Sequence, residues 1–325
     1  MATQINLDSV SFVMPVLNEE KHLEAAVLSI FQQEGMKKDQ IEVILALGPS
    51  TDQTNKVAEA LKSTLPVKLV QNPTGKTPAG LNLAIKAASN PVIVRVDAHS
   101  ELSPDYTSLA LQILNETGAA NVGGVMKAEG FSPFQRAVAW GYGSRLGLGG
   151  GLYHIGGSAG PSDSVYLGVF RHEILEKLGG FNEKMVRGQD WELNLRIRNS
   201  GEVVWFDPRL QVTYHPRSSM KNLIKQFFDT GSWRAELTRS HLARANLRYF
   251  APPAMVLVSL SGLIAGLFGL TLGFIPLAGY LSVVLLAAIL NKKLRTLDRF
   301  ALLAVLPAMH FSWGIGFIAG LFHRR

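Results

Sequence analysis

A tract of 37 residues from Ala254 to Leu290 contains no charged side chain, and a second uncharged stretch runs from Phe300 to Phe322. A helix needs about 20 apolar residues to cross the ~30 Å hydrocarbon core of a bilayer, so the first tract is nearly long enough for two helices. The turn from Gly273 to Pro276 separates them. We therefore predict three membrane-spanning helices, of which the second is short and the third either spans or re-enters. These lengths disfavour a buried helix of a soluble core.

The chain carries a formal net charge of +7, and basic residues gather beside the apolar tracts. Between Arg217 and Arg248 there are seven Lys or Arg residues and only two acids. Because this block directly precedes the apolar tract, it favours a membrane lipid surface over nucleic acid as a partner. The segment 291–299 is also basic, and positive charge marks the cytoplasmic side. We expect a multi-pass protein of the cytoplasmic (plasma) membrane with residues 1–250 in the cytoplasm.

The N-terminal part of the chain alternates between apolar runs typical of strands and segments with helical spacing. Strands alternating with helices of about ten residues indicate right-handed βαβ units and a parallel sheet. In such sheets ligands bind beyond the carboxyl ends of the strands. The predicted strands are 9–17, 41–47, 66–72 and 91–98, and the predicted helices are 19–33, 51–61 and 79–89.

Polar residues follow three of these strands. Asn18 and Glu19 follow the first strand, Asp52 follows the second, and the fourth ends in Asp97 with His99 two residues on. On an extended chain, residues i and i+2 lie on the same side with Cα atoms about 6.5–7 Å apart. Asp97 and His99 can therefore converge on one cation or one phosphate group.

The segment 141–164 is rich in glycine and lacks an apolar period. We interpret it as a mobile loop, which is either a lid or binding loop of an active site or a surface insertion. The chain then divides into a soluble α/β domain (1–215), basic amphipathic interfacial helices (216–250) and a membrane domain (251–325). No cysteine is present, so disulfides and thiolate metal sites are excluded.

Four stretches together resemble a family 2 inverting glycosyltransferase with the A-type (GT-A) nucleotide-sugar fold: "FVMPVLNEEKHLEAAVLSIFQQ", "STD" at 50–52, "VRVDAHS" and "GQDWELNLRIRNSG". The "DAH" and the C-terminal apolar helices are most similar to a membrane-bound group that includes succinoglycan-biosynthesis enzymes. The soluble resemblance covers about 9 to 235. It implies a Rossmann-like, mostly parallel sheet domain and a hexosyltransferase. The expected donor is a nucleoside diphosphate sugar, and the expected acceptor is a lipid-linked or cell-envelope glycan.

The resemblance implies a divalent cation, Mn²⁺ or Mg²⁺, that bridges the donor diphosphate. Asp97 fills the first position of the family's Asp-x-Asp motif, and His99 stands where a second aspartate is usual. His215 matches a histidine that completes the metal site in some relatives. Oxygen ligands suit either ion, and an imidazole shifts the preference toward Mn²⁺. The alternatives are that Asp97 caps a turn, that His99 contacts only water or backbone, and that His215 is structural.

The resemblance also assigns the catalytic base. Asp190 matches the family's aspartate, whereas Gln189 replaces the usual preceding glutamate, and Trp191 is assigned to the acceptor side. A base must lie within hydrogen-bond reach of the acceptor hydroxyl. Glu192 lies about 200° round the same predicted helix, so we expect it to face elsewhere. Alternatively, Asp190 only caps this helix.

Further residues are assigned to the donor by the same resemblance: Pro15, Asn18, Glu19, Asp52 and Lys76. Lys76 either neutralises diphosphate charge or is an ordinary solvated lysine. The family's second strand usually ends in an aspartate that contacts the base, whereas this chain has Leu47, Gly48 and Pro49 there. The identity of the base is therefore open.

The segment 224–237 resembles the helix that follows the catalytic residues in the family and carries a Gln-x-x-Arg-Trp element near the acceptor. Gln226, Trp233 and Arg234 are present here with altered spacing and order. The structural alternative is an amphipathic interfacial helix with a Trp anchor. Two other functions stay open: a polyprenyl-phosphate sugar synthase, and a non-catalytic membrane protein that senses nucleotide sugars.

Overall fold

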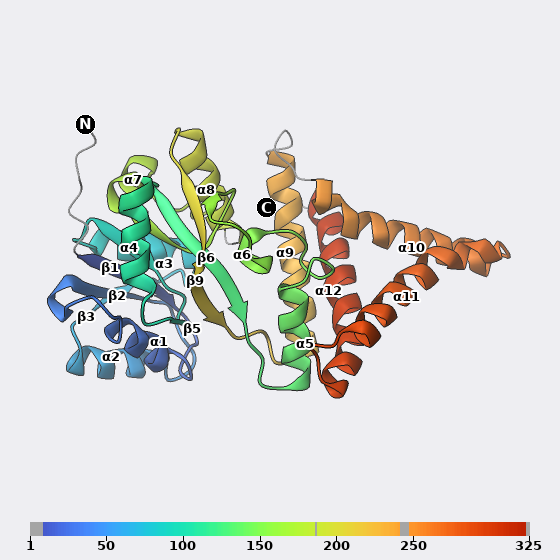
Figure 1. The fold of residues 1–325 in the computed structure, drawn as a ribbon, viewed down its shortest axis with the longest axis horizontal. Helices are drawn as coiled ribbons and strands as arrows, with labels where there is room; N and C mark the ends of the chain where they lie inside the picture. Colours follow the sequence, from blue (N-terminus) through green and yellow to red (C-terminus); the bar gives the residue numbers. More distant parts are fainter. Residues whose placement is uncertain (1–8, 186, 241–246, 323–325) are drawn as a thin grey trace. The chain divides into compact units, whose positions relative to one another are not determined.

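A computed structural model describes residues 9–185, 187–240 and 247–322 (Figure 1). The chain divides into two compact units, each made of two chain segments. Unit 1 comprises Met1–Lys127 and Gly151–Tyr214, and unit 2 comprises Ala128–Gly150 and His215–Arg325. One of the three boundaries along the chain, between Gly150 and Gly151, falls inside the glycine-rich segment.

Unit 1 is built on a mixed sheet of nine strands in the order β3-β2-β1-β4-β8-β6-β9-β5, with β7 paired to β9. The pairs β3–β2, β2–β1 and β1–β4 are parallel, whereas β8 runs antiparallel to β4 and β6 antiparallel to β8. The strands are β1 (Val10–Val16), β2 (Ile41–Leu47), β3 (Val67–Gln71), β4 (Val92–Arg95), β5 (Ser100–Leu102), β6 (Asn121–Ala128), β7 (Gly160–Pro161), β8 (Tyr166–Arg171) and β9 (Val204–Tyr214).

Helices cover both faces of this sheet, which explains why its parallel strands are almost entirely apolar. Alternate residues of β1 enter different cores: Phe12 and Met14 pack on one face, and Val13 packs on the other. Helices α1 (Leu23–Phe31), α2 (Thr54–Thr64) and α4 (Tyr106–Thr117) contribute to the first core, and α3 (Thr77–Ala87), α7 (His172–Leu178) and α8 (Gln189–Asn199) contribute to the second.

The predicted α/β alternation is confirmed over the first four strands and three helices. The bounds differ at the polar ends. Helix α1 begins at Leu23 instead of 19, and β4 ends at Arg95 instead of 98, because the polar residues there form loops. The irregular loop predicted over 141–164 is wrong in part, since it contains α6 (Leu152–Ile155) and β7. Gly160 and Pro161 of β7 pair with β9, and a two-residue strand leaves no periodic signal.

Unit 2 is helical: α5 (Pro133–Tyr142), α9 (Met220–Ser240), the short 3₁₀ turns at Leu247–Phe250 and Thr271–Phe274, α10 (Ala251–Leu267), α11 (Ile275–Leu290) and α12 (Thr296–Phe322). Glycines let α9 and α12 pack closely. A Cβ on Gly316 would lie 2.1 Å from the carbonyl oxygen of Phe228, and one on Gly231 would lie 2.0 Å from that of Trp313. Any larger side chain at either position would force the two helices apart.

Buried polar contacts join α12 to the rest of unit 2. Arg136 of α5 donates two hydrogen bonds to Asp298, from Nε at 3.0 Å and from Nη2 at 2.8 Å. Further along α12, Nε2 of His310 lies 2.8 Å from the carbonyl oxygen of Leu146, and Nδ1 lies 2.9 Å from the Tyr280 hydroxyl. The first part of the glycine-rich segment is therefore held by a histidine of an apolar helix.

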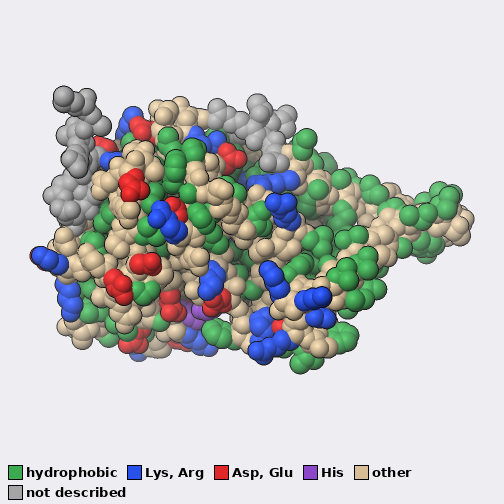
Figure 2. Space-filling view, in the orientation of Figure 1, with side chains coloured by type: hydrophobic (Ala, Val, Ile, Leu, Met, Phe, Trp, Pro, Cys, Tyr) green, Lys and Arg blue, Asp and Glu red, His purple; other side chains and the backbone are tan. Residues whose placement is uncertain are grey.

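Among the residues that the structure describes, three helical stretches are long and apolar enough to cross a membrane: Leu247–Leu267, Thr271–Leu290 and Thr296–Phe322. Helix α12 is continuous for 27 residues, which corresponds to about 40 Å. Apolar side chains cover the exposed surface of α10 and α11 (Figure 2). The lengths agree with the three predicted spans, including the third.

Candidate active site

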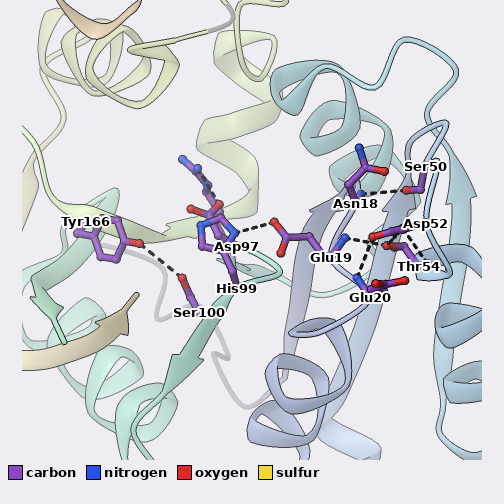
Figure 3. Close-up of polar contacts among 11 residues, drawn as sticks. Asn18, Glu19, Glu20, Ser50, Asp52, Thr54, Asp97, His99, Ser100 and Tyr166 are labelled. Carbon is purple, nitrogen blue, oxygen red and sulfur yellow. Dashed lines mark hydrogen bonds and ion pairs between the residues drawn. The ribbon is translucent and has the colours of Figure 1, made fainter. Parts of the chain in front are cut away.

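The loops after β1 and β2 are tied together by Asn18 (Figure 3). The side-chain oxygen of Asn18 accepts a hydrogen bond from the Thr51 N–H at 2.8 Å, and the Asn18 N–H donates to Ser50 Oγ at 3.1 Å. Asn18 itself has φ of 56°, a left-handed conformation that Asn tolerates better than most residues. Asn18, which the sequence assigns to the donor, therefore also stabilises the conformation of these two loops.

Asp52 organises the start of α2 in the same loop pair. Its carboxylate accepts hydrogen bonds from the Thr54 hydroxyl at 2.5 Å, the Thr54 N–H at 3.0 Å and the Glu20 N–H at 3.3 Å. These bonds, first the one from the Thr54 hydroxyl, lower the pKa of Asp52 against the opposing effect of burial. Asp52 is therefore ionised at neutral pH and fixes the loop that carries Glu19.

Glu19 reaches from the β1 loop to the end of β4. Its carboxylate lies 2.9 Å from Nδ1 of His99, and its N–H donates to Thr54 Oγ1 at 2.7 Å (Figure 3). The His99 ring also meets Tyr214 edge-on, with ring centroids 6.0 Å apart. Two residues assigned from separate motifs, Glu19 and His99, are thus direct neighbours.

Arg95 connects Asp97 and Asp190 at the carboxyl end of β4. Its Nη2 donates to Asp97 Oδ1 at 2.9 Å, and its Nη1 donates to Asp190 Oδ1. The Arg95 side chain is 6% exposed, whereas those of Asp97 and Asp190 are 19% and 39% exposed. The structure therefore brings the assigned donor-side acid and the assigned base to one guanidinium, and the acids are more accessible than the cation between them.

Electrostatics at this edge depend on burial and on Arg95. Burial alone would raise the pKa of Asp97, but the charges of Arg95 and His99 and the hydrogen bond from Arg95 lower it overall. Burial, followed by the negative charge of Asp97, raises the pKa of Tyr166 well above its usual value. The Tyr166 hydroxyl lies 3.5 Å from Ser100 Oγ (Figure 3). Asp97 is thus ionised and Tyr166 protonated at neutral pH.

Glu192 points away from this cluster, as its helical spacing predicts. It accepts from Nε and Nη2 of Arg196 at 2.7 and 2.8 Å, and Arg196 also donates to the carbonyl oxygens of Leu178 and Gly180. Gln189 is buried at the first position of α8, and Trp191 is partly buried. Glu192 and Arg196 therefore anchor α8, while Asp190 faces Arg95.

Pro15 and Lys76 occupy different environments near the carboxyl ends of the strands. Pro15 is paired with Ala46 in the sheet and packs against α3, where a Cβ on Gly80 would lie 3.3 Å from it. Lys76 is exposed at the N-cap of α3. The backbone is crowded where the family's base-contacting aspartate is expected, because a Cβ on Gly48 would lie 3.0 Å from Leu17 and 3.3 Å from the Gly75 Cα.

The remaining assigned residues belong to unit 2. His215 Nδ1 lies 3.2 Å from the Glu129 carbonyl oxygen, and its ring is 4.9 Å from that of Phe131. Gln226, Trp233 and Arg234 lie on α9, and the Arg234 guanidinium is 4.5 Å from the Tyr249 ring. Their assigned roles at the metal and the acceptor stay predictions.

Arg95 and Tyr166, whose charges and hydrogen bonds act on Asp97 or respond to it, were not assigned from the sequence. Arg95 stands within the apolar run "VIVRVDA", and a lone arginine in a buried strand is a signal that it pairs with acids. Tyr166 gave no such signal, because it starts a strand that follows the glycine-rich segment.

The cluster lies where α/β sheets bind ligands, and comparison with known proteins identifies the family. Residues 11–179 match the model of the family described as Glycosyl transferase family 2. The succinoglycan biosynthesis protein ExoA of Rhizobium meliloti (strain 1021) is 30% identical over 256 residues, which cover 78% of this chain and 77% of that protein. The chain belongs to glycosyl transferase family 2, and the predicted likeness to succinoglycan-biosynthesis enzymes is confirmed.

A more distant curated relative is the dolichyl N-acetyl-α-D-glucosaminyl phosphate 3-β-D-2,3-diacetamido-2,3-dideoxy-β-D-glucuronosyltransferase of Methanococcus voltae. It is 25% identical over 272 residues, which cover 80% of this chain and 83% of that protein. The sequence likeness to both curated relatives thus extends over more of the chain than the family match does.

Solved structures confirm the predicted GT-A-like fold. The mannosyltransferase PcManGT of Pyrobaculum calidifontis, in complex with GDP-Man and Mn²⁺, superposes with a TM-score of 0.60 at 20% identity, covering 96% of this chain and 87% of that chain. S. aureus TarS 1-349 in complex with UDP-GlcNAc gives 0.54 at 16% identity, covering 93% and 89%.

The residues present fit a cation that arrives with its substrate. Within the described ranges, no three His, Asp or Glu side chains are grouped closely enough to hold a metal ion. Mg²⁺-type sites, however, commonly use one or two protein carboxylates and complete their coordination with substrate phosphates and water. Asp97, with His99 beside it, matches such an open donor set.

Proposed function

We propose that this protein is a membrane-anchored, inverting hexosyltransferase that moves a sugar from a nucleoside diphosphate sugar to a lipid-linked or cell-envelope glycan. The observation that carries this proposal is the bridge from Arg95 to both Asp97 and Asp190 in a family 2 glycosyltransferase. One guanidinium brings together an acid suited to the donor and an acid suited to the acceptor. The donor and the acceptor react only when they are held next to each other, so the acids that serve them have to lie close together.

On the donor side, Asp97 and His99 are the residues of unit 1 that would hold a divalent cation, with His215 as a further assigned ligand. When bound, a divalent cation supplies positive charge that stabilises the leaving diphosphate. The Mn²⁺ in the complex of the Pyrobaculum mannosyltransferase supports this assignment. Glu19 orients His99 through their 2.9 Å contact, Asn18 and Asp52 shape the loops beneath the donor, and Pro15 is assigned to the donor from near the end of β1. Exposed Lys76 would neutralise diphosphate charge.

On the acceptor side, Asp190 takes the proton of the attacking hydroxyl. The acceptor oxygen then forms its bond to the anomeric carbon as the bond from that carbon to the diphosphate oxygen breaks. The electron pair leaves with the nucleoside diphosphate, and displacement from the opposite face inverts the anomeric centre. Trp191, Gln226, Trp233 and Arg234 are assigned to the acceptor. The part of the glycine-rich segment in unit 1 would close over the donor.

We assign residues 1–215 to catalysis, 216–250 to the membrane surface and 251–325 to the membrane. An acceptor carried on a membrane lipid would reach the enzyme at the basic block. The dolichyl phosphate in the name of the Methanococcus relative supports this acceptor class.

The orientation can be tested separately with cysteine labelling, because the native chain has no cysteine. We expect residues 1–250 and the loop 291–299 to be cytoplasmic. A cysteine at Lys293 should therefore resist an impermeant thiol reagent in intact cells and react after permeabilisation. Rapid labelling in intact cells would overturn the orientation.

The function is tested by incubating membranes that contain the protein with UDP- and GDP-sugars, beginning with UDP-GlcNAc and GDP-mannose. Sugar should pass to an extractable lipid or glycan and leave nucleoside diphosphate. A protein that only senses nucleotide sugars would bind donor without turnover. Labelling of a polyprenyl phosphate itself would favour a polyprenyl-phosphate sugar synthase, whose ionised acceptor needs no strong base.

A further inference from the structure

Arg95 is more buried than either of the two acids to which it donates hydrogen bonds. It is the last residue of β4, and its place is fixed by the parallel register with β1, where it is aligned with Val13. Its guanidinium also lies 6.0 Å from the Phe181 ring centroid. Its backbone is therefore fixed by the sheet, and a group bonded to its side chain is anchored to that fixed point.

The two acids that Arg95 holds come from different elements. Asp97 follows β4 on the same stretch of chain, whereas Asp190 is the second residue of α8, 95 residues after Arg95 in the sequence. They bond to different nitrogens, Nη2 and Nη1, of one rigid planar group. A guanidinium fork constrains direction as well as distance, which the point charge of a lysine does not. The separation of the two carboxylates is thus set by Arg95.

The positive charge of Arg95 also affects how Asp97 and Asp190 can meet a substrate. Asp97 and Asp190 are both more exposed than Arg95, so each can turn its second oxygen to a substrate while its first stays bonded. Two neighbouring carboxylates and an incoming diphosphate repel one another, and the buried guanidinium offsets part of that repulsion. A purely structural arginine would need neither two acids nor their exposure.

We propose that Arg95 is the positioning residue of this site. It holds the catalytic base Asp190 at a fixed distance and direction from the donor-side acid Asp97 when the donor binds. The inference rests on the proposed function. It predicts that loss of the fork lowers the rate of transfer much more than it weakens donor binding, because a misaligned base costs rate chiefly in the transition state.

The test compares Arg95→Lys, Arg95→Ala and a control, Arg171→Lys, in the full-length protein with the donor that the parent transfers. Arg171 lies on the neighbouring strand β8, is aligned with Val92 at the far end of β4, and donates to the carbonyl oxygens of Ala119 and Leu114. We expect kcat to fall about 10- to 100-fold in Arg95→Lys, with the donor KM within about threefold of the parent value. Arg171→Lys should keep the parental kcat.

Chemical rescue separates positioning from mere stability. Millimolar guanidinium chloride should raise the rate of Arg95→Ala at least several-fold by filling the vacated place, whereas equal concentrations of sodium chloride should not. If Arg95→Ala does not fold, the test rests on Arg95→Lys, in which kcat should fall while the donor KM stays near the parent value. A parental kcat in Arg95→Lys, or a folded Arg95→Ala that guanidinium does not rescue, would overturn the inference. A parent protein that turns over no sugar nucleotide would instead refute the proposed function.

Discussion

The two units each contain a buried arginine–carboxylate contact, and the contacts differ in how open they are. In unit 2, Arg136 grips Asp298 through two parallel hydrogen bonds, and the Asp298 side chain is only 2% exposed. In unit 1, Arg95 divides its fork between Asp97 and Asp190, which stay 19% and 39% exposed. The closed pair saturates its carboxylate, whereas the open bridge leaves carboxylate oxygens available. An ion pair that leaves its acids accessible is suited to chemistry, and one that encloses them is suited to holding helices together.

The largest effect is expected at Asp97. Asp97→Ala should abolish donor turnover, because it removes both the assigned cation ligand and one partner of buried Arg95. Excess chelator should abolish turnover in the parent protein, and added Mn²⁺ or Mg²⁺ should restore it. Nucleoside diphosphate release is the measurement. Full activity in excess chelator would mean that Asp97 holds something other than a required cation.

The next effect is expected at Asp190. Asp190→Asn keeps the size of the side chain but removes the proton acceptor, and positioned general bases contribute about 10²–10⁴-fold, so transfer should fall by about that factor. Donor affinity should change little. The matched control is Glu192→Gln on the same helix, which alters only the contact with Arg196 and should cost less.

Transfer rate and donor affinity should be measured for both α8 variants, with folding checked separately. Near-parental transfer in Asp190→Asn together with loss in Glu192→Gln would mean that the base is misassigned. Transfer retained in both variants would indicate an acceptor that is already ionised, and it would support the polyprenyl-phosphate alternative.

The closed pair of Arg136 and Asp298 should matter for stability and not for catalytic rate. Asp298→Asn should reduce the free energy of unfolding, because it weakens the contact between Arg136 and a carboxylate that is almost closed to solvent. The folded fraction should keep parental kcat. Unfolding in detergent and the rate per folded molecule are the measurements. A variant of parental stability with reduced kcat would erase the distinction between the two contacts.

The elements of this molecule that depend on local composition can be predicted from the sequence, whereas its long-range contacts cannot. Apolar period and length predict the first four strands, three helices and the three long apolar helices, because burial and bilayer thickness act on local composition. Motif spacing assigns Asp97 and Asp190. It does not pair them through Arg95, because that contact joins residues 95 positions apart. Nor does it pair Glu19 with His99 across 80 positions. Long-range pairing is set by how the strands order in the sheet, and local pattern does not encode that order.

Among the variants of the open site, the smallest effect on turnover is expected at His99, whose contact with Glu19 sharpens the comparison. His99→Ala should weaken Mn²⁺ affinity about 10- to 100-fold, by analogy with perturbed metal shells, and should leave the rate at saturating Mn²⁺ closer to the parent value. The measurement is donor turnover against free Mn²⁺, with the exposed Glu101→Gln of β5 as the control. Glu19→Gln should shift the Mn²⁺ dependence in the same direction but less, because it only orients the imidazole at 2.9 Å. An unchanged Mn²⁺ dependence in His99→Ala, with a shift in Glu19→Gln, would reverse these roles: Glu19 would be the ligand and His99 the group that positions it.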